Sequence, residues 1–137
     1  MKVFLDTNIL IDVVARRAEF YEAANNIINL GIEGDVTLCV TPMSYATCVF
    51  IARKVLGYQG AMKVLQLLDK YIEVVAMTPT QCHEALFADM PDFEDMLQYK
   101  AAFDAGCACL VTRNGKHFPQ DGIPILSPKE FLDSYVD

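Results

Sequence analysis

The sequence has 137 residues and a mass of 15.3 kDa, which is the size of one ordinary domain. Hydrophobic residues make up 53% and charged residues 21%, a balance that allows a packed core and excludes a disordered chain. Eighteen acidic residues against eleven lysines and arginines give a net charge of −7, which argues against a generally basic surface for nucleic-acid phosphates. Because no apolar run approaches the ~18 residues of a membrane span, and Asp6 comes too early for a signal peptide, we expect one cytoplasmic domain, residues 1–137, without a membrane segment.

The apolar residues alternate between short β-type segments and longer helical ones. In chain order, the pattern predicts a strand at residues 2–5, helices at 7–15 and 20–32, a strand at 36–40, and helices at 42–56 and 59–70 on either side of Gly57. It then predicts a strand at 71–77, helices starting at Pro79 and after Asp92, strands at 108–112 and 124–126, and a last helix starting at Pro128.

Strand and helix therefore alternate five times, and the connections lack the turn residues of β-hairpins. Two of the helix starts, Thr41-Pro42 and Thr78-Pro79, combine a capping hydroxyl with a proline at the first helical position. Parallel strands joined by helical crossovers produce such an alternation. We therefore predict an α/β fold, a three-layer α/β/α sandwich with a central parallel sheet of about five strands.

Polar segments follow the predicted strands at three places. They are Asp6-Thr7-Asn8 after the first strand, residues 92–95 at a helix start, and Thr112-Arg113-Asn114 after the fourth strand. In an open parallel sheet, ligands bind at the carboxyl ends of the strands, near the point where the strand order reverses. Each segment also has a purely structural interpretation, as a helix cap or a turn. Their convergence at one edge is what makes a functional site the stronger hypothesis.

Carboxylates that meet at such an edge predict a cation site. Two of them ~5 Å apart repel each other by about 3 kcal/mol at an effective dielectric of ~20, so they pair with a base, raise a pKa or hold a cation. The two histidines, His83 and His117, are interpreted as surface residues without a role in acid–base chemistry. Oxygen-only ligands favour Mg²⁺ or Mn²⁺ over zinc, and such an ion would activate water for hydrolysis of a phosphodiester.

Three stretches of the sequence resemble a known family. They are FLDTNILID at residues 4–12, FEDMLQ at 93–98 and LVTRN at 110–114. Their residues, order and separation are similar to those of PIN domains, and the resemblance covers essentially the whole chain. It is greatest to the bacterial single-domain branch of VapC-type ribonuclease toxins. The resemblance implies a Mg²⁺- or Mn²⁺-dependent endoribonuclease with RNA as substrate, an antitoxin protein as partner and a homodimeric assembly.

The resemblance also implies roles for individual residues. Asp6 matches the first acid of the family and Asp95 the third, and both would hold the metal ion. Thr7 and Asn8 match the polar pair that orients ligands and water, and Thr112 matches the hydroxyl beside the fourth acidic position. We therefore predict that the catalytic residues are Asp6, Asp95 and Asn114 and that the substrate-binding residues are Thr7, Asn8, Thr112 and Arg113. The predicted metal ligands are Asp6, Asp95, Asp92 and Glu94.

The sequence departs from the family pattern at two of the four acids. No Asp or Glu occurs between Asp35 and Asp69, where the family has its second acid, and only Ser44 or Thr47 is available to face the site there. Asn114 replaces the fourth acid. Loss of carboxylates weakens a site for a hard cation.

Nearby acids offer compensation for this loss. Asp92 lies one helical turn before Asp95, whereas Glu94 points roughly 100° away from Asp95 on an ideal helix. Asp12 lies further along the first helix and has a structural interpretation as well.

A second hypothesis is a catalytically impaired PIN-fold module that binds RNA or protein. In that case Arg113 would pair with Asp6 or Asp95 and take the place of the metal ion, whereas in an active enzyme it would be free for an RNA phosphate.

Overall fold

A computed structural model describes residues 1–135. Its five strands form one parallel sheet in the order β3-β2-β1-β4-β5. The strands are β1 (Lys2–Leu5), β2 (Thr37–Val40), β3 (Ile72–Val74), β4 (Cys109–Val111) and β5 (Ile125–Leu126). The α-helices are α1 (Thr7–Val14), α2 (Tyr21–Ile32), α3 (Pro42–Leu68), α4 (Pro79–Leu86), α5 (Phe93–Asp104) and α6 (Pro128–Tyr135), and two short 3₁₀ helices are η1 (Asp69–Tyr71) and η2 (Gly115–His117).

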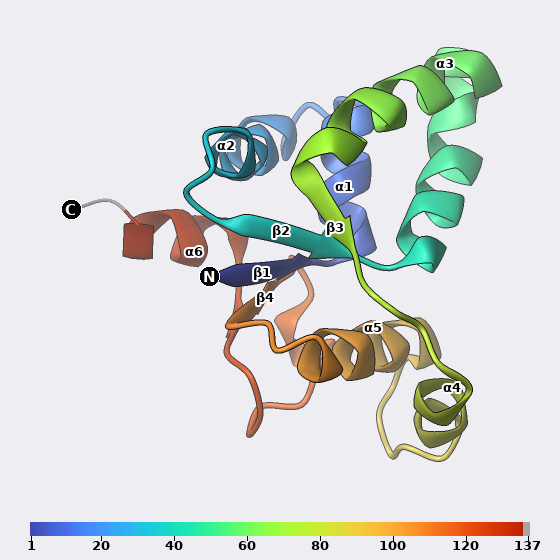
Figure 1. Cartoon of the computed structure of the whole chain (residues 1–137), viewed down its shortest axis with the longest axis vertical. Coiled ribbons are helices and arrows are strands. Elements are labelled where there is room, and N and C mark those ends of the chain that lie inside the picture. Colours follow the sequence, from blue (N-terminus) through green and yellow to red (C-terminus); the bar gives the residue numbers. More distant parts are fainter. Residues whose placement is uncertain (136–137) are drawn as a thin grey trace.

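Helices cover both faces of the sheet, which confirms the predicted three-layer α/β/α sandwich. Figure 1 shows α1, α2 and α3 on one side and α4 and α5 on the other. The side chains of β1 divide accordingly, because Val3 and Leu5 join the core under α1 while Phe4 joins the core under α5. Among residues 1–135, no helix has the length and apolar content to cross a membrane.

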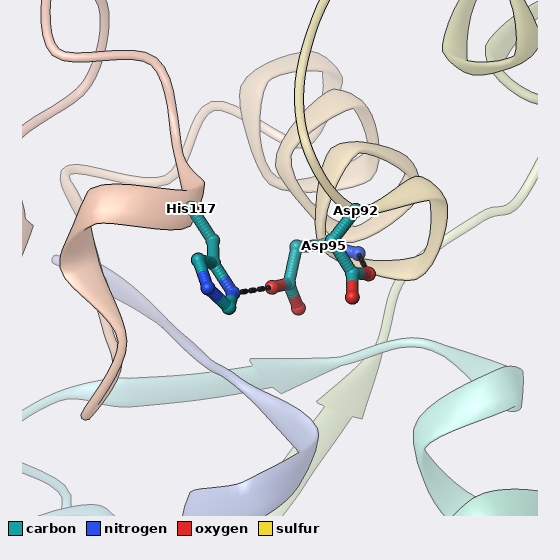
Figure 2. Close-up of side chains that lie close together, drawn as sticks. All are labelled: Asp92, Asp95 and His117. Carbon is teal, nitrogen blue, oxygen red and sulfur yellow. Dashed lines mark hydrogen bonds and ion pairs between the residues drawn. The ribbon is translucent and has the colours of Figure 1, made fainter.

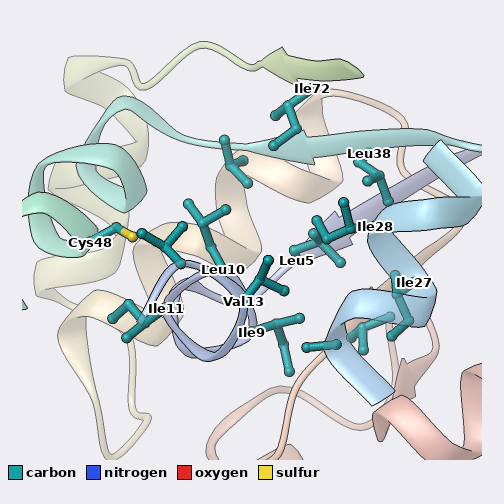
Figure 3. Close-up of a cluster of buried hydrophobic side chains, with 14 of the residues drawn as sticks. Leu5, Ile9, Leu10, Ile11, Val13, Ile27, Ile28, Leu38, Cys48 and Ile72 are labelled. Atoms are coloured by element: carbon teal, nitrogen blue, oxygen red, sulfur yellow. The ribbon is translucent and has the colours of Figure 1, made fainter. Parts of the chain in front are cut away.

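The core under α1 is the larger of the two. Leu5, Leu10 and Leu38 are fully buried in it, and Figure 3 shows α1 against the sheet, with α2 on one side and α3 on the other. The helix α1 packs closely against α3, and the Thr7 hydroxyl in its first turn contacts the Ser44 hydroxyl of α3. This rigid packing determines the position of Asp6, the residue between β1 and α1.

One predicted strand is longer than the observed strand, whereas a predicted break between two helices is confirmed. The strand predicted at 71–77 is only Ile72–Val74, because its neighbour β2 ends at Val40 and Val75 makes the last ladder bond, to the Val40 carbonyl. The predicted break at Gly57 is confirmed, because α3 consists of two helices that meet at a kink at that glycine. Gly57 has a φ of 73°, a left-handed value that favours glycine and explains why the direction of the helix changes there.

Candidate functional site

The candidate site lies where the order of the strands reverses, between β1 and β4. Asp6 follows β1 and Thr112 follows β4, and the backbone N–H of Asp6 donates to the Val111 carbonyl at 3.0 Å. The first turns of α5 reach the same edge, because Gln98 contacts both Asp6 and Thr7. Segments about 90 to 110 residues apart in sequence therefore meet at one end of the sheet, as the sequence predicted.

Asp6 is not a helix cap, although it occupies the N-cap position of α1. Its carboxylate makes no capping hydrogen bond and is only 2% exposed. One oxygen, Oδ2, accepts from the Thr112 hydroxyl at 2.8 Å, and the other, Oδ1, accepts from the Gln98 side-chain amide at 3.0 Å. Each carboxylate oxygen thus has a fixed donor, so the side chain is held facing the site.

Asp92 and Asp95 take different positions in the first turn of α5. Asp92 is a true N-cap, because its Oδ1 accepts from the backbone N–H of Asp95 at 2.9 Å. The Asp95 carboxylate instead faces the site, where Oδ1 lies 3.4 Å from the Gln98 amide nitrogen and Oδ2 lies 3.0 Å from Nδ1 of His117. In this segment Asp92 therefore caps the helix, and Asp95 faces the site.

Gln98 connects the two carboxylates and was missed as a site residue by the sequence analysis. Its amide donates to Asp6 and Asp95, while its carbonyl oxygen accepts from the backbone N–H of Thr7 at 2.9 Å and from the Thr7 hydroxyl at 3.0 Å. The side chain is buried and uses its full capacity of two donated and two accepted bonds. The sequence did contain one signal for this role, because Gln98 lies one helical turn after Asp95 and therefore on the same face of the helix.

The structure places His117 beside the acidic residues of the site, a contact that the interpretation as a surface residue did not predict. The ring projects from η2 toward Asp95, as Figure 2 shows, and its side chain is 34% exposed. Asp92, Asp95 and His117 each offer one ligand atom, and these atoms lie within 4.8 Å of one another. The histidine reaches the site because η2 folds the chain back three residues after Asn114, a local turn that the sequence pattern did not predict. His83, in contrast, is exposed on α4.

The surroundings of Asp95 disfavour its charge in the metal-free protein. Burial, followed by the negative charges of Asp6 and Asp92, raises the pKa of Asp95 from an ordinary value of 3.8 to about 6, although the contact with His117 acts in the opposite direction. Repulsion between carboxylates was the expected signature of a cation site, and a bound divalent ion would relieve it.

The positions of the two missing acids are occupied by neutral residues. Ser44, in the first turn of α3, is fully buried, and its hydroxyl contacts Thr41 and Thr7. Asn114 is half-buried, and its backbone N–H donates to the Thr112 hydroxyl. Asn8 is half-buried in the first turn of α1. None of these side chains adds a charge to the site.

Glu94 and Arg113 lie apart from the acidic group. Glu94 is exposed and does not belong to the cluster formed by Asp92, Asp95 and His117. Arg113 pairs with neither Asp6 nor Asp95. Its Nε and Nη2 bind Asp12 at 2.9 and 3.1 Å, and its guanidinium stacks on a phenylalanine ring of the α1–α2 connection, Phe20, at 3.7 Å. The alternative in which this arginine replaces a metal ion at the site is therefore excluded.

The donor set suits a divalent cation. Asp6, Asp95 and Asp92 supply carboxylate oxygens, and His117 supplies a nitrogen. Among residues 1–135, no lysine or arginine forms an ion pair with any of these three carboxylates. The excess negative charge is therefore offset only by His117 when its ring is protonated, and the residues fit a metal ion of the Mg²⁺ or Mn²⁺ type.

Comparison with known proteins agrees with this arrangement. The model of the PIN domain family matches residues 2–116. The chain belongs to the PIN domain family. It is similar to ribonuclease VapC1 of Aquifex aeolicus, with 23% identity over 139 residues that cover 98% of this chain and 95% of the relative.

Solved structures share the fold of this PIN domain. DNA-bound VapBC from Salmonella typhimurium superimposes with a TM-score of 0.68 at 20% identity, covering 93% of this chain and 98% of the other. VapC20 of Mycobacterium tuberculosis, described as a toxin that cleaves the sarcin–ricin loop, gives 0.62 at 14% identity, covering 87% and 91%. At these identities the likeness concerns the fold, and the chemistry has to be argued from the site.

Proposed function

We propose that this PIN domain is a toxin-like endoribonuclease that hydrolyses RNA phosphodiester bonds with Mg²⁺ or Mn²⁺ bound at Asp6 and Asp95. The observation that carries the proposal is the pairing of these two carboxylates around a single amide, that of Gln98, with no arginine or lysine bound to either within residues 1–135. If the two carboxylates only stabilised the fold, we would expect a basic side chain to pair with them and offset their repulsion.

The residues of the site divide into those that hold the ion and those that hold its ligands. Asp6 and Asp95 would bind the metal, with Asp92 as a third carboxylate. A bound Mg²⁺ or Mn²⁺ would supply Lewis-acid stabilisation of the phosphodiester and activation of the attacking water. Thr112 and Gln98 orient Asp6 through hydrogen bonds to its two oxygens. Such contacts keep the first ligand in one rotamer before the metal arrives.

The amides at the edge of the site are the proposed substrate contacts. Asn8 and Asn114 are both half-buried. Asn8 lies two residues after Asp6, and the backbone N–H of Asn114 contacts the Thr112 hydroxyl that binds Asp6. We assign Asn114 to the orientation of the scissile phosphate or the attacking water, because an amide both donates and accepts hydrogen bonds. Since Arg113 is bound to Asp12, phosphate contacts from that guanidinium are not part of the proposal.

The relatives support the toxin-like assignment and an antitoxin as partner. One is named a ribonuclease, another a toxin, and several solved neighbours are VapBC complexes. A homodimer is also proposed, and the exposed apolar residues of α3 support it. These residues are Phe50, Val55, Leu56, Tyr58 and Leu67.

Cleavage of a labelled single-stranded RNA by the purified protein tests the proposal. We expect cleavage with Mn²⁺ or Mg²⁺, its loss with a chelator, and its loss in Asp6→Asn. Asp35→Asn, which changes an exposed acid outside the site, is the matched control and should cleave like the wild type. Metal-saturated protein that binds the RNA and leaves it intact would instead support the impaired binding module.

A further inference from the structure

His117 is the one nitrogen donor among the ligand atoms that converge at the site within residues 1–135. It comes from η2, whereas Asp92 and Asp95 come from the start of α5, so the contact joins two separate elements (Figure 2). We infer that His117 is a metal ligand of this site and that it makes the site prefer Mn²⁺ to Mg²⁺. The inference rests on the proposed function, since it assigns a ligand to the same metal centre.

The spacing of the donor atoms supports this assignment. His117 Nδ1 lies 3.0 Å from Asp95 Oδ2. Neighbouring ligands of an octahedral ion with bonds of about 2.1 Å lie about 3.0 Å apart, so both atoms can contact one ion without a change in their separation. In the metal-free protein a proton lies between the two atoms and makes the hydrogen bond. An ion bound to both atoms would lie about 45° off the line that joins them, so metal binding would remove this proton and turn both lone pairs toward the ion.

The composition of the site explains why a histidine is useful there. Ser44 and Asn114 stand where the resemblance places two acids, so the set of carboxylates is reduced. His117 restores one ligand without adding a further negative charge beside Asp6 and Asp95. Its position also requires no rearrangement of the sheet, because η2 already directs the ring at Asp95.

The nature of the donor determines the choice of metal. Imidazole nitrogen is a good ligand for first-row transition metals, whereas Mg²⁺ prefers oxygen ligands and retains several waters. A site with His117 in it therefore gains affinity for Mn²⁺ and gains little for Mg²⁺. Replacement of the ring by a carboxylate should reverse the effect.

Separate calorimetric titrations of Mn²⁺ and Mg²⁺ into the full chain test the inference. The variants are His117→Ala and His117→Asp, and His83→Ala is the matched control, since it removes an exposed histidine on α4. We expect His117→Ala to weaken Mn²⁺ binding about tenfold or more and Mg²⁺ binding less than about threefold. His117→Asp should bring the Mg²⁺ and Mn²⁺ affinities closer together, and His83→Ala should leave both unchanged.

A spectroscopic measurement gives a direct readout of the bond. Electron spin echo spectroscopy of the Mn²⁺-loaded protein, labelled with ¹⁵N-histidine, should show one coupled nitrogen that disappears in His117→Ala and persists in His83→Ala. Equal weakening of both metals, or a Mn²⁺ spectrum without a histidine nitrogen, would overturn the assignment of His117 and leave the carboxylate site intact. Absence of Mn²⁺ and Mg²⁺ binding by the wild-type protein would overturn the proposed function as well.

Discussion

Asp12 and Arg113 form a two-bond ion pair between α1 and the segment that follows β4. Asp12 is fully buried in α1, and the Nε and Nη2 atoms of Arg113 bind its two oxygens at 2.9 and 3.1 Å. Arg17 adds a longer contact of 3.5 Å. The pair attaches the chain after β4 to the helix that starts at Asp6, so it fixes the distance between the segments that carry Asp6 and Asn114.

We expect Arg113→Met to reduce the free energy of unfolding by about 3 kcal/mol or more, because it leaves a buried carboxylate with only a distant partner. The double variant Asp12→Asn/Arg113→Met should lose less than the sum of the two single variants. Urea unfolding at pH 7.5 measures both, with the exposed Arg53→Met as control. Additive losses would show that the two side chains are not coupled.

Replacement of Gln98 should separate its structural role from the charge of the site. Gln98→Met leaves the backbone N–H of Thr7 and one oxygen of Asp6 without their partner, and we expect a loss of roughly 2 to 3 kcal/mol in stability. Gln98→Glu keeps an acceptor for Thr7 and adds a further carboxylate between Asp6 and Asp95. Its melting temperature should therefore depend more strongly on Mn²⁺ than that of the wild type, and equal dependence in a thermal melt would contradict this account.

The raised pKa of Asp95 has a defined effect on stability. In the unfolded chain the group titrates near 3.8 and in the folded protein near 6, so the folded state holds the proton more tightly. Stability from this group is therefore greatest at low pH, falls between about pH 4 and 6, and stays low above that range. The cost of the charged form is up to about 3 kcal/mol.

Asp95→Asn should accordingly be more stable than the metal-free wild type at pH 7.5, and this advantage should shrink toward pH 4. Saturating Mn²⁺ should reverse the order at pH 7.5, because only the wild type gains from binding. Thermal unfolding at the two pH values checks both statements. A variant that is less stable than the metal-free wild type at pH 7.5 would show that the carboxylate is not under repulsion.

Asn114→Asp should strengthen the metal site. It places a carboxylate at the half-buried position after Thr112, and we expect Mn²⁺ and Mg²⁺ to bind roughly tenfold more tightly. Calorimetric titration measures the change, and Asn26→Asp on the exposed side of α2 is the matched control. Unchanged affinity would place residue 114 outside the metal's ligands.

The fold could be predicted because its signals are local. The helix starts at Thr41 and Thr78 each form a capping box, which depends only on residues within one helical turn. The short strand β1 is also readable, since a run of apolar residues ends abruptly at Asp6. The strand β3 was predicted too long because its length depends on where its neighbour β2 ends. The residues of β3 alone do not contain that information.

The site was only partly predictable, because its remaining members depend on contacts between distant segments. Asp6 and Asp95 follow from their positions at a strand end and a helix start. Gln98 and His117 could not be predicted in this way, because their partners lie far away in the sequence. Gln98 contacts Asp6, 92 residues away, and His117 contacts Asp95, 22 residues away. Arg113 was considered as a partner for the wrong acid, because its pairing with Asp12 is visible only after α1 and β4 are placed side by side.

The hydrogen bond between Asp6 and Thr112 joins residues that are 106 positions apart. During synthesis of the chain, Asp6 emerges early and has to wait until β4 is made and inserted beside β1 before its carboxylate is oriented. Closing so long a segment is slow compared with the folding of single helices. The candidate site is therefore not assembled while most of the chain is still being translated.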